Sequence, residues 1–180
     1  RGRGVTRLAL IGPRGSGKSA TGRHLAQRLE CPFVDADEEL QRRTGRTIAA
    51  IFADEGEAGF RDREAALLAE LLERPALVLS TGGGVVLRET NRERLATLPF
   101  VIWLYAEPAT LWHRIQADAH RGVTRPNLAG GGLAEVEKIV AAREPLYAAV
   151  ATHRIETTHR RPDEVMAAAL ALLASGEREP

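Results

Sequence analysis

The chain has 180 residues, which fits one domain of ordinary size and leaves little room for a second. Its 25 basic and 24 acidic side chains give a formal net charge of +1, and this balance argues against a general nucleic-acid binder and a polybasic membrane binder. A single cysteine, Cys31, excludes an internal disulfide and a multi-cysteine zinc site, and no apolar run approaches the ~20 residues of a membrane span.

Short apolar runs alternate with amphipathic helical stretches along the chain. The first residues, Arg1–Gly4, include neither an initiator Met nor the apolar part of a signal peptide, so we expect an artificial start or a domain cut from a longer chain. The apolar runs predict five strands, at residues 8–11, 33–34, 76–79, 100–104 and 153–156. Helices are expected at residues 18–29, 133–150 and 162–173. Strands without strict polar alternation, separated by helices, indicate an α/β protein with a parallel sheet covered on both faces.

The first predicted strand runs into Gly12–Ser19, which matches G-x-x-x-x-G-K-[ST] at every fixed position and opens the first predicted helix. Glycines let backbone N–H groups converge on phosphate oxygens, and the helix N-terminus adds positive potential. Lys18, one of only two lysines in the chain, is expected to reach the β- and γ-phosphates, and the Ser19 hydroxyl to ligate Mg²⁺. The motif predicts a nucleoside-triphosphate site and does not name the acceptor.

Two acids, Asp35 and Asp37, follow the second apolar run. At positions i and i+2 their carboxylates project to the same side if the chain is still extended there, toward the crevice of the phosphate loop. One acid would then hold the waters of Mg²⁺ while the other contacts the acceptor hydroxyl. The alternative is that Asp37 only caps a helix that begins near Glu38.

Two further motifs carry candidate ligand groups. Arg61 and Glu64 lie three residues apart, so they share a helix face and can pair, although a solvent-exposed charge run fits the same spacing. Gly82–Gly84 follow the third predicted strand. Three glycines at this place allow a ligand to approach the backbone closely, and a flexible turn is the alternative.

Two arginines occupy unusual places in the second half of the chain. Arg143 falls on the apolar stripe of the helix at 133–150 and needs an anionic partner, either an internal glutamate or a substrate carboxylate, and planar bidentate geometry favours the substrate. Arg125 lies in the glycine-rich segment 118–132, whose length predicts a mobile lid. There it would stabilise the transferring phosphoryl group, or it is a solvated loop residue.

Together these motifs resemble the shikimate kinase family of the P-loop kinase superfamily, near the nucleoside monophosphate kinases. The P-loop is shared across the superfamily, whereas the other motifs in this order are much more specific. The likeness covers most of the chain and adds to the P-loop the motifs Asp35-x-Asp37, Thr44-Gly45-Arg46, Ile48-Ala49-x-Ile51-Phe52, Phe60-Arg61-x-x-Glu64, Gly82-Gly83-Gly84, Arg125-Pro126 and Arg143-x-Pro145-Leu146-Tyr147. The lid differs, because Asn127 stands where family lids commonly have leucine.

The resemblance implies a three-layer α/β/α P-loop kinase fold with a five-stranded parallel sheet of order 2-3-1-4-5. It implies one domain over residues 1–180, with a substrate-binding region near 35–64 and a lid near 118–132. The implied reaction is ATP-dependent phosphorylation of the 3-hydroxyl of shikimate, a step of chorismate and aromatic amino-acid biosynthesis, with ATP as co-substrate and Mg²⁺ as cofactor. We expect a cytoplasmic monomer without nucleic-acid or membrane partners. The single cysteine suits the reducing environment of that compartment.

The resemblance also implies roles for single residues. Lys18 and Arg125 would stabilise the transferred phosphoryl group, and Asp37 would accept the hydroxyl proton or orient the acceptor. Shikimate would be bound by Asp37, Arg61, Gly82, Gly83, Gly84 and Arg143, between the walls Phe52 and Phe60, with the two arginines on its carboxylate. The nucleotide would be bound by Gly15, Ser16, Gly17, Lys18, Ser19, Ala20, Arg114, Arg125, Arg160 and Pro162, and the metal by Ser19 and Asp35.

Two other functions fit parts of the pattern. Another small-molecule kinase of the superfamily, such as a gluconate kinase, has less need of both Arg61 and Arg143. The other is a non-catalytic nucleotide-sensing domain that uses ATP to bind a partner protein. It has no need of the full set Lys18, Ser19, Asp35, Asp37, Arg61 and Arg143.

Overall fold

The computed structural model describes residues 6–120 and 131–176, which form five strands and seven α-helices. In chain order the elements are β1 (Arg7–Ile11), α1 (Lys18–Leu29), β2 (Phe33–Asp35), α2 (Ala36–Thr44), α3 (Ile48–Leu71), β3 (Leu77–Ser80), the 3₁₀ turn η1 (Val85–Leu87), α4 (Glu89–Leu95), β4 (Phe100–Tyr105), α5 (Pro108–His120), α6 (Gly132–Val150), β5 (His153–Glu156) and α7 (Pro162–Ser175). None of the helices in these two ranges is both long and apolar enough to cross a membrane.

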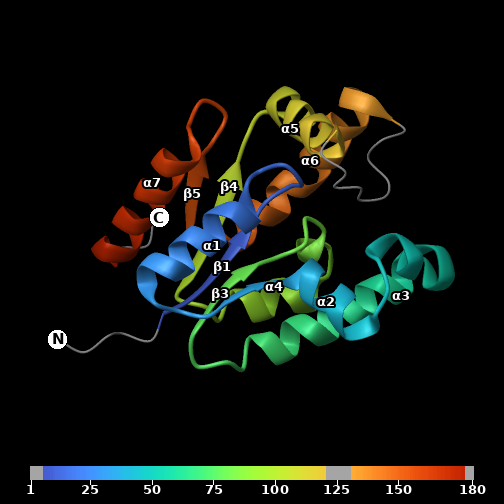
Figure 1. Cartoon of the computed structure of the whole chain (residues 1–180), viewed down its shortest axis with the longest axis horizontal. Helices are drawn as coiled ribbons and strands as arrows, with labels where there is room; N and C mark the ends of the chain where they lie inside the picture. Colours follow the sequence, from blue (N-terminus) through green and yellow to red (C-terminus); the bar gives the residue numbers. More distant parts are fainter. Residues whose placement is uncertain (1–5, 121–130, 177–180) are drawn as a thin grey trace.

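The five strands pair in parallel in the order β2-β3-β1-β4-β5, which confirms the predicted order (Figure 1). β1 is the central strand, and its Ala9 lies opposite Leu79 of β3 and Val101 of β4. A strand in this position is covered on both faces, which explains why its sequence does not alternate between apolar and polar residues.

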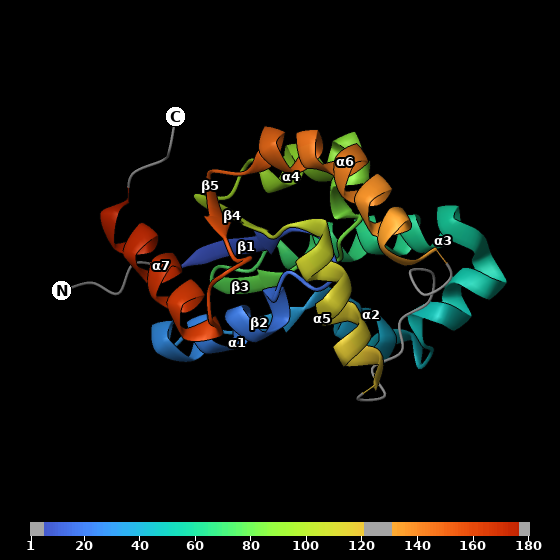
Figure 2. The same ribbon diagram turned by 90° about the horizontal axis from the view of Figure 1, so that it is seen from above.

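Helices cover both faces of the sheet and complete the predicted three layers (Figures 1 and 2). Leu8 and Leu10 of β1 pack with α1 and α7 on one face. Ala9 and Ile11 point to the opposite face, where α3, α4 and α6 supply most of the apolar side chains. The loops at the carboxyl ends of β1, β2 and β3 therefore open at one edge of the sheet, where ligands bind in open α/β folds.

The ends of two predicted elements are wrong. α2 begins at Ala36 rather than near Glu38, because the Asp35 side chain caps it. Residues 118–120 continue α5 and Gly132 already belongs to α6, so the predicted lid 118–132 is too long at both ends. Alanines before His120 favour helix and extend α5 into that segment. The remainder, 121–130, lies outside the described residues, and Arg125 with it.

The long helix α3 bends at Gly56, where φ is 70° and ψ is −177°. A positive φ is accessible to glycine at little cost, so this residue permits the bend. The segments on either side carry Phe52 and Phe60, whose ring centroids lie 4.5 Å apart. The bend thus folds α3 around the region where the sequence places the acceptor.

Candidate active site

The loop between β1 and α1 is shaped to receive phosphate. Gly12 and Gly17 have φ values of 141° and 91°. A Cβ on Gly12 would lie 2.6 Å from the Leu104 carbonyl oxygen, so only glycine fits there. Gly17 caps α1 without a side-chain hydrogen bond, which leaves the first N–H groups of the helix to an anion.

Lys18 is folded back over this loop. Its side chain is buried, and Nζ donates to the carbonyl oxygens of Gly12 at 2.8 Å and Pro13 at 2.9 Å. These bonds fix the ammonium among the backbone groups of the loop. A guanidinium fork is larger and would not fit the same place, which gives a reason for lysine in a chain that otherwise favours arginine.

Asp35 connects the phosphate loop with α2. Its Oδ1 accepts from the backbone N–H groups of Asp37 at 3.0 Å and Glu38 at 3.1 Å, and its Oδ2 accepts from the Ser19 hydroxyl. The chain is therefore not extended through Asp37, and that part of the prediction is wrong. The predicted alternative is also wrong, because the cap is Asp35 and Asp37 lies in the first turn of α2. Asp37 reaches the site from a helix.

The Ser19–Asp35 pair offers hard oxygen atoms beside the phosphate loop. The Ser80 hydroxyl lies 3.3 Å from that of Ser19. Among the described residues no group of three or more His, Cys, Asp or Glu side chains could hold a metal. One hydroxyl and one carboxylate, with the remaining positions left to water and phosphate, are nevertheless the donor set that Mg²⁺ commonly takes in phosphoryl-transfer enzymes. The residues present fit Mg²⁺.

A nucleotide-sized cavity of about 540 Å³ adjoins the loop. Arg114 of α5 lies in its wall and donates to Thr157, at 3.1 Å to the hydroxyl and 2.7 Å to the carbonyl oxygen, which ties α5 to the segment after β5. Burial lowers the pKa of Arg114. The wall brings together the predicted nucleotide residues of the described chain, namely Gly15, Ser16, Gly17, Lys18, Ser19, Ala20, Arg114, Arg160 and Pro162.

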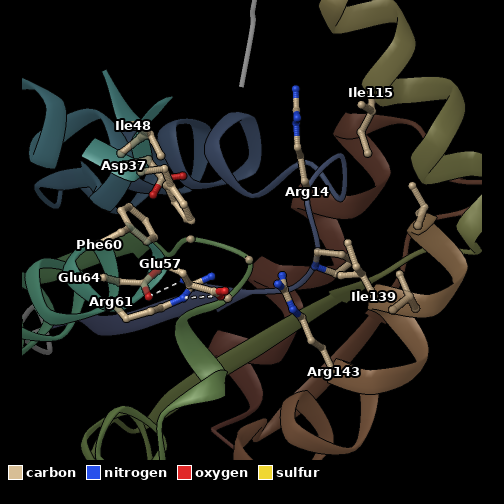
Figure 3. A pocket seen from close by; sticks show the side chains of 17 residues that line it. Arg14, Asp37, Ile48, Glu57, Phe60, Arg61, Glu64, Ile115, Ile139 and Arg143 are labelled. Carbon is tan, nitrogen blue, oxygen red and sulfur yellow. Dashed lines mark hydrogen bonds and ion pairs between the residues drawn. The ribbon is translucent and has the colours of Figure 1, made fainter. Parts of the chain in front are cut away.

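A second cavity, of about 250 Å³, is lined in part by Pro13 and Arg14 of the phosphate loop (Figure 3). It brings together the predicted acceptor residues Asp37, Phe52, Phe60, Arg61, Gly82, Gly83, Gly84 and Arg143. We call it the acceptor cavity and the first one the nucleotide cavity.

Arg61 and Glu64 form a buried ion pair in the wall of the acceptor cavity. Arg61 Nη1 lies 2.7 Å from Glu64 Oε2, and their side chains are 12% and 5% exposed, so the predicted pairing is confirmed and the alternative of a solvated charge run is wrong. Burial raises the pKa of Glu64, although the neighbouring Arg61 opposes that shift. Glu57 approaches Arg61 Nε at 3.6 Å, and the Phe60 ring lies against the guanidinium.

The three glycines after β3 make room for these charges. A Cβ on Gly82 would lie 2.7 Å from Glu64 Oε1 and 3.1 Å from Asp37 Oδ1, and a Cβ on Gly84 would overlap the Arg61 guanidinium. The alternative of a merely flexible turn therefore fails at these two positions. The turn brings its backbone within reach of both helices that carry charged groups.

Arg143 of α6 points into the acceptor cavity from the side opposite Asp37 and Phe60 (Figure 3). Among the described residues it forms no ion pair with a glutamate or aspartate, so the internal partner that the sequence allowed is not found there. Its guanidinium lies beside the glycine turn, where a Cβ on Gly83 would be 3.6 Å from Arg143 Nη1. Tyr147 donates to the Gly83 carbonyl oxygen at 2.5 Å.

Sequence reasoning missed two residues of this site. Arg14 occupies a variable position of the P-loop motif, so the motif carries no signal for it, yet it lines both cavities. Tyr147 belongs to the motif that contains Arg143 but received no role of its own. The available signal was its spacing, because residues four apart share a helix face.

Comparison with known proteins gives a consistent result. The family model described as shikimate kinase matches residues 14–174. A shikimate kinase from Symbiobacterium thermophilum is 47% identical over 174 residues, which are 95% of this chain and 98% of the relative, and one from Rhodopirellula baltica is 46% identical over 160 residues, 88% and 86% of the two chains.

Solved structures agree with the sequence comparison. The shikimate kinase from Acinetobacter baumannii in complex with shikimate has a TM-score of 0.89 and 38% identity, over 97% of this chain and 96% of that one. A gluconokinase from Sinorhizobium meliloti, with a TM-score of 0.65 and 20% identity over 97% and 94%, shares the fold alone.

Proposed function

This chain belongs to the shikimate kinase family, and from that premise we propose that it transfers the γ-phosphoryl group of ATP to the 3-hydroxyl of shikimate. The observation that carries the proposal is the acceptor cavity, which places Arg61 and Arg143 on facing walls beside the phosphate loop. Shikimate is a small carboxylic acid with ring hydroxyls. A cavity whose walls carry two guanidinium groups and a carboxylate, Asp37, matches both kinds of group.

The two arginines bind the substrate carboxylate in this account. Guanidinium forks pair with a carboxylate through two parallel hydrogen bonds, which fixes the plane of the acid as well as its position. Arg61 is held by Glu64, so its fork is oriented before the substrate arrives. Gluconate is also an acid, but the gluconokinase resemblance shows only the fold and favours no second function for this chain.

The chemical step exchanges one phosphorus–oxygen bond for another. The shikimate 3-oxygen forms a bond to the γ-phosphorus, the bond from this phosphorus to the β,γ-bridging oxygen breaks, and ADP leaves with the electron pair. The hydroxyl proton passes to the Asp37 carboxylate and then to solvent, or Asp37 only orients the hydroxyl. Lys18 stabilises the charge on the phosphates, and positioning supplies most of the catalysis. The family resemblance alone assigns Arg125 a role here, as a further cation on the transferring phosphoryl group.

Mg²⁺ fits beside the phosphate loop, where Ser19 and, through water, Asp35 would hold it. The metal would neutralise charge on the β- and γ-phosphate oxygens. The Ser19–Asp35 bond keeps both oxygen atoms in place. We further propose a single domain over the whole chain that acts as a cytoplasmic monomer, for which the free Cys31 thiol suits a reducing compartment.

A coupled assay of ADP release tests the function. With ATP and Mg²⁺ present, shikimate should stimulate ADP release well above the ATP-only background, and gluconate should not. Stimulation by gluconate and not by shikimate would show that the protein is a gluconate kinase. An absence of stimulation by every acid tried, with ATP still bound, would leave a nucleotide-sensing domain and refute the proposal.

A further inference from the structure

Arg14 is the one described residue that lines both the nucleotide cavity and the acceptor cavity. It lies in the phosphate loop between Gly12 and Gly15, and its side chain is half-buried. Figure 3 shows it on the Ile115 side of the acceptor cavity, with Asp37 across from it. No role follows for Arg14 from the P-loop motif or from the residues that bind the two substrates at their far ends.

The backbone on both sides of Arg14 is held in place. Lys18 Nζ donates to the carbonyl oxygens of Gly12 and Pro13, the two residues that precede Arg14. The carbonyl oxygen of Gly15, the residue after it, accepts from Arg114 Nη1 at 3.3 Å. A Cβ on Gly15 would lie 3.1 Å from the Leu111 carbonyl oxygen, so the loop is also packed closely against α5. The Arg14 guanidinium therefore extends from a fixed base.

Phosphoryl transfer takes place between the two cavities, and Arg14 lines both of them. The terminal phosphoryl group enters from the nucleotide cavity, and the acceptor hydroxyl enters from the acceptor cavity. The other two arginines of the acceptor cavity do not line the nucleotide cavity, and the proposed function assigns both to the substrate carboxylate. A guanidinium at the junction presents several N–H donors to phosphate oxygens, where negative charge is spread over the equatorial oxygens during transfer.

We propose that Arg14 contacts the phosphoryl group as it passes from ATP to the acceptor oxygen, and that it binds the phosphate of the product. The bonds exchanged are those of the proposed function, on which this inference rests: one oxygen–phosphorus bond forms to shikimate and one breaks to ADP. Arg14 forms no covalent bond and keeps its proton. It is a catalytic residue that acts by charge, built into the loop rather than carried by the lid.

The test compares wild type with Arg14→Met, which keeps an unbranched side chain and removes the guanidinium. Steady-state ADP release should show kcat lowered by about 10²-fold, the loss typical of one preorganised donor to a developing anion, with the KM values for shikimate and ATP within about threefold. Arg14→Lys should recover part of kcat because it restores a charge without the fork. Calorimetric titration of the ADP-loaded protein should show weaker binding of shikimate 3-phosphate and unchanged binding of shikimate.

Arg28→Met is the matched control. Arg28 is exposed in the last turn of α1 and lines neither cavity, so its loss should leave kcat within about twofold. A kcat for Arg14→Met within about threefold of wild type, or a change confined to the KM for ATP, would overturn the inference while wild type still turns over shikimate. A wild type that releases no ADP with shikimate would instead overturn the proposed function and this inference with it.

Discussion

Arg61 and Arg143 face the same cavity from different helices, and they are supported in different ways. Arg61 is fixed by a buried carboxylate, whereas Arg143 carries no ion pair among the described residues. Arg143 therefore keeps more of its hydrogen-bonding capacity for a ligand. Arg143 is half-buried, and a cation withdrawn from water is stabilised by an anion, so the arrangement fits a site that a substrate carboxylate completes.

Replacing Arg143 tests this role. Arg143→Ala should lower kcat/KM for shikimate by about 10²- to 10⁴-fold, since two charge-assisted hydrogen bonds are lost, and should leave ATP affinity unchanged. Steady-state kinetics and calorimetric ATP binding measure the two effects. Lys138→Ala, an exposed change on the same helix, is the control and should behave as wild type. Lost ATP binding with normal shikimate binding would contradict the assignment.

Tyr147 holds the Gly83 carbonyl oxygen, beside which the Arg143 guanidinium lies, so we expect it to position this part of the acceptor cavity. Burial raises the pKa of Tyr147 to about 12, so the hydroxyl remains a donor throughout the neutral range. Tyr147→Phe removes one hydroxyl, and the KM for shikimate should rise by up to about tenfold while kcat and the KM for ATP change less. Tyr105→Phe, at the other tyrosine of the chain, should leave all three constants unchanged. Equal losses for both substrates would indicate a general structural role.

At this scale the sequence could predict residue types better than their geometry. The motifs named Asp35 and Asp37, but the direction of each carboxylate depended on where β2 ends. That end is set by the hydrogen bonds of Asp35 to the next helix, which have no signature in periodicity. Arg14 could not be recognised for a similar reason, since its importance comes from two cavities meeting beside it.

Among the elements, α3 contributes most to the acceptor cavity. The bend at Gly56 is braced by Glu55, which binds Arg46 at 2.6 Å from before the helix and Arg63 at 2.7 Å from beyond the bend. These bonds hold the segment with Phe52 against the segment with Phe60 and Arg61. The sequence predicted neither the bend nor its brace, because the helical pattern continues through the glycine and the ion pairs join residues eight or nine positions apart.

The brace predicts an acid-dependent contribution to stability. Its partners Arg63 and Arg46 lower the pKa of Glu55 from its ordinary value of 4.5 to about 2. Because the pKa of Glu55 is lower in the folded state, ionised Glu55 stabilises the fold at pH values above 4.5. This contribution is lost as the pH falls from 4.5 through about 2. Glu55→Gln should therefore flatten the decline of the free energy of unfolding over that range, as urea titrations at several pH values would show.

Glu93→Gln is the matched control for the acid titration. Glu93 is exposed on α4 and has no ion-pair partner among the described residues, so its replacement should keep the wild-type slope. A Glu55→Gln protein with the wild-type slope would show that the brace does not contribute to stability. The direction of the effect is the test, because exposed ion pairs contribute little at neutral pH.

For the whole molecule, the parallel sheet was the most predictable feature. Its strands are short apolar runs without alternation, and buried parallel strands have that pattern because helices cover both faces. The order β2-β3-β1-β4-β5 came from the family resemblance rather than from periodicity, and the structure confirms it. The sheet then places three loops at one edge, so the two cavities follow from the topology. The helix ends near residues 118–132 could not be predicted, because glycines and helix-forming alanines compete there.

The acceptor cavity, in our proposal, binds the carboxylate of shikimate between Arg61 and Arg143 beside the phosphate loop. A crystal structure with shikimate and ADP measures this directly. We predict the carboxylate within hydrogen-bonding distance of Arg61 and Arg143, and the 3-hydroxyl near Asp37 and facing the nucleotide cavity. Shikimate bound elsewhere, or bound with its carboxylate away from both arginines, would contradict the account.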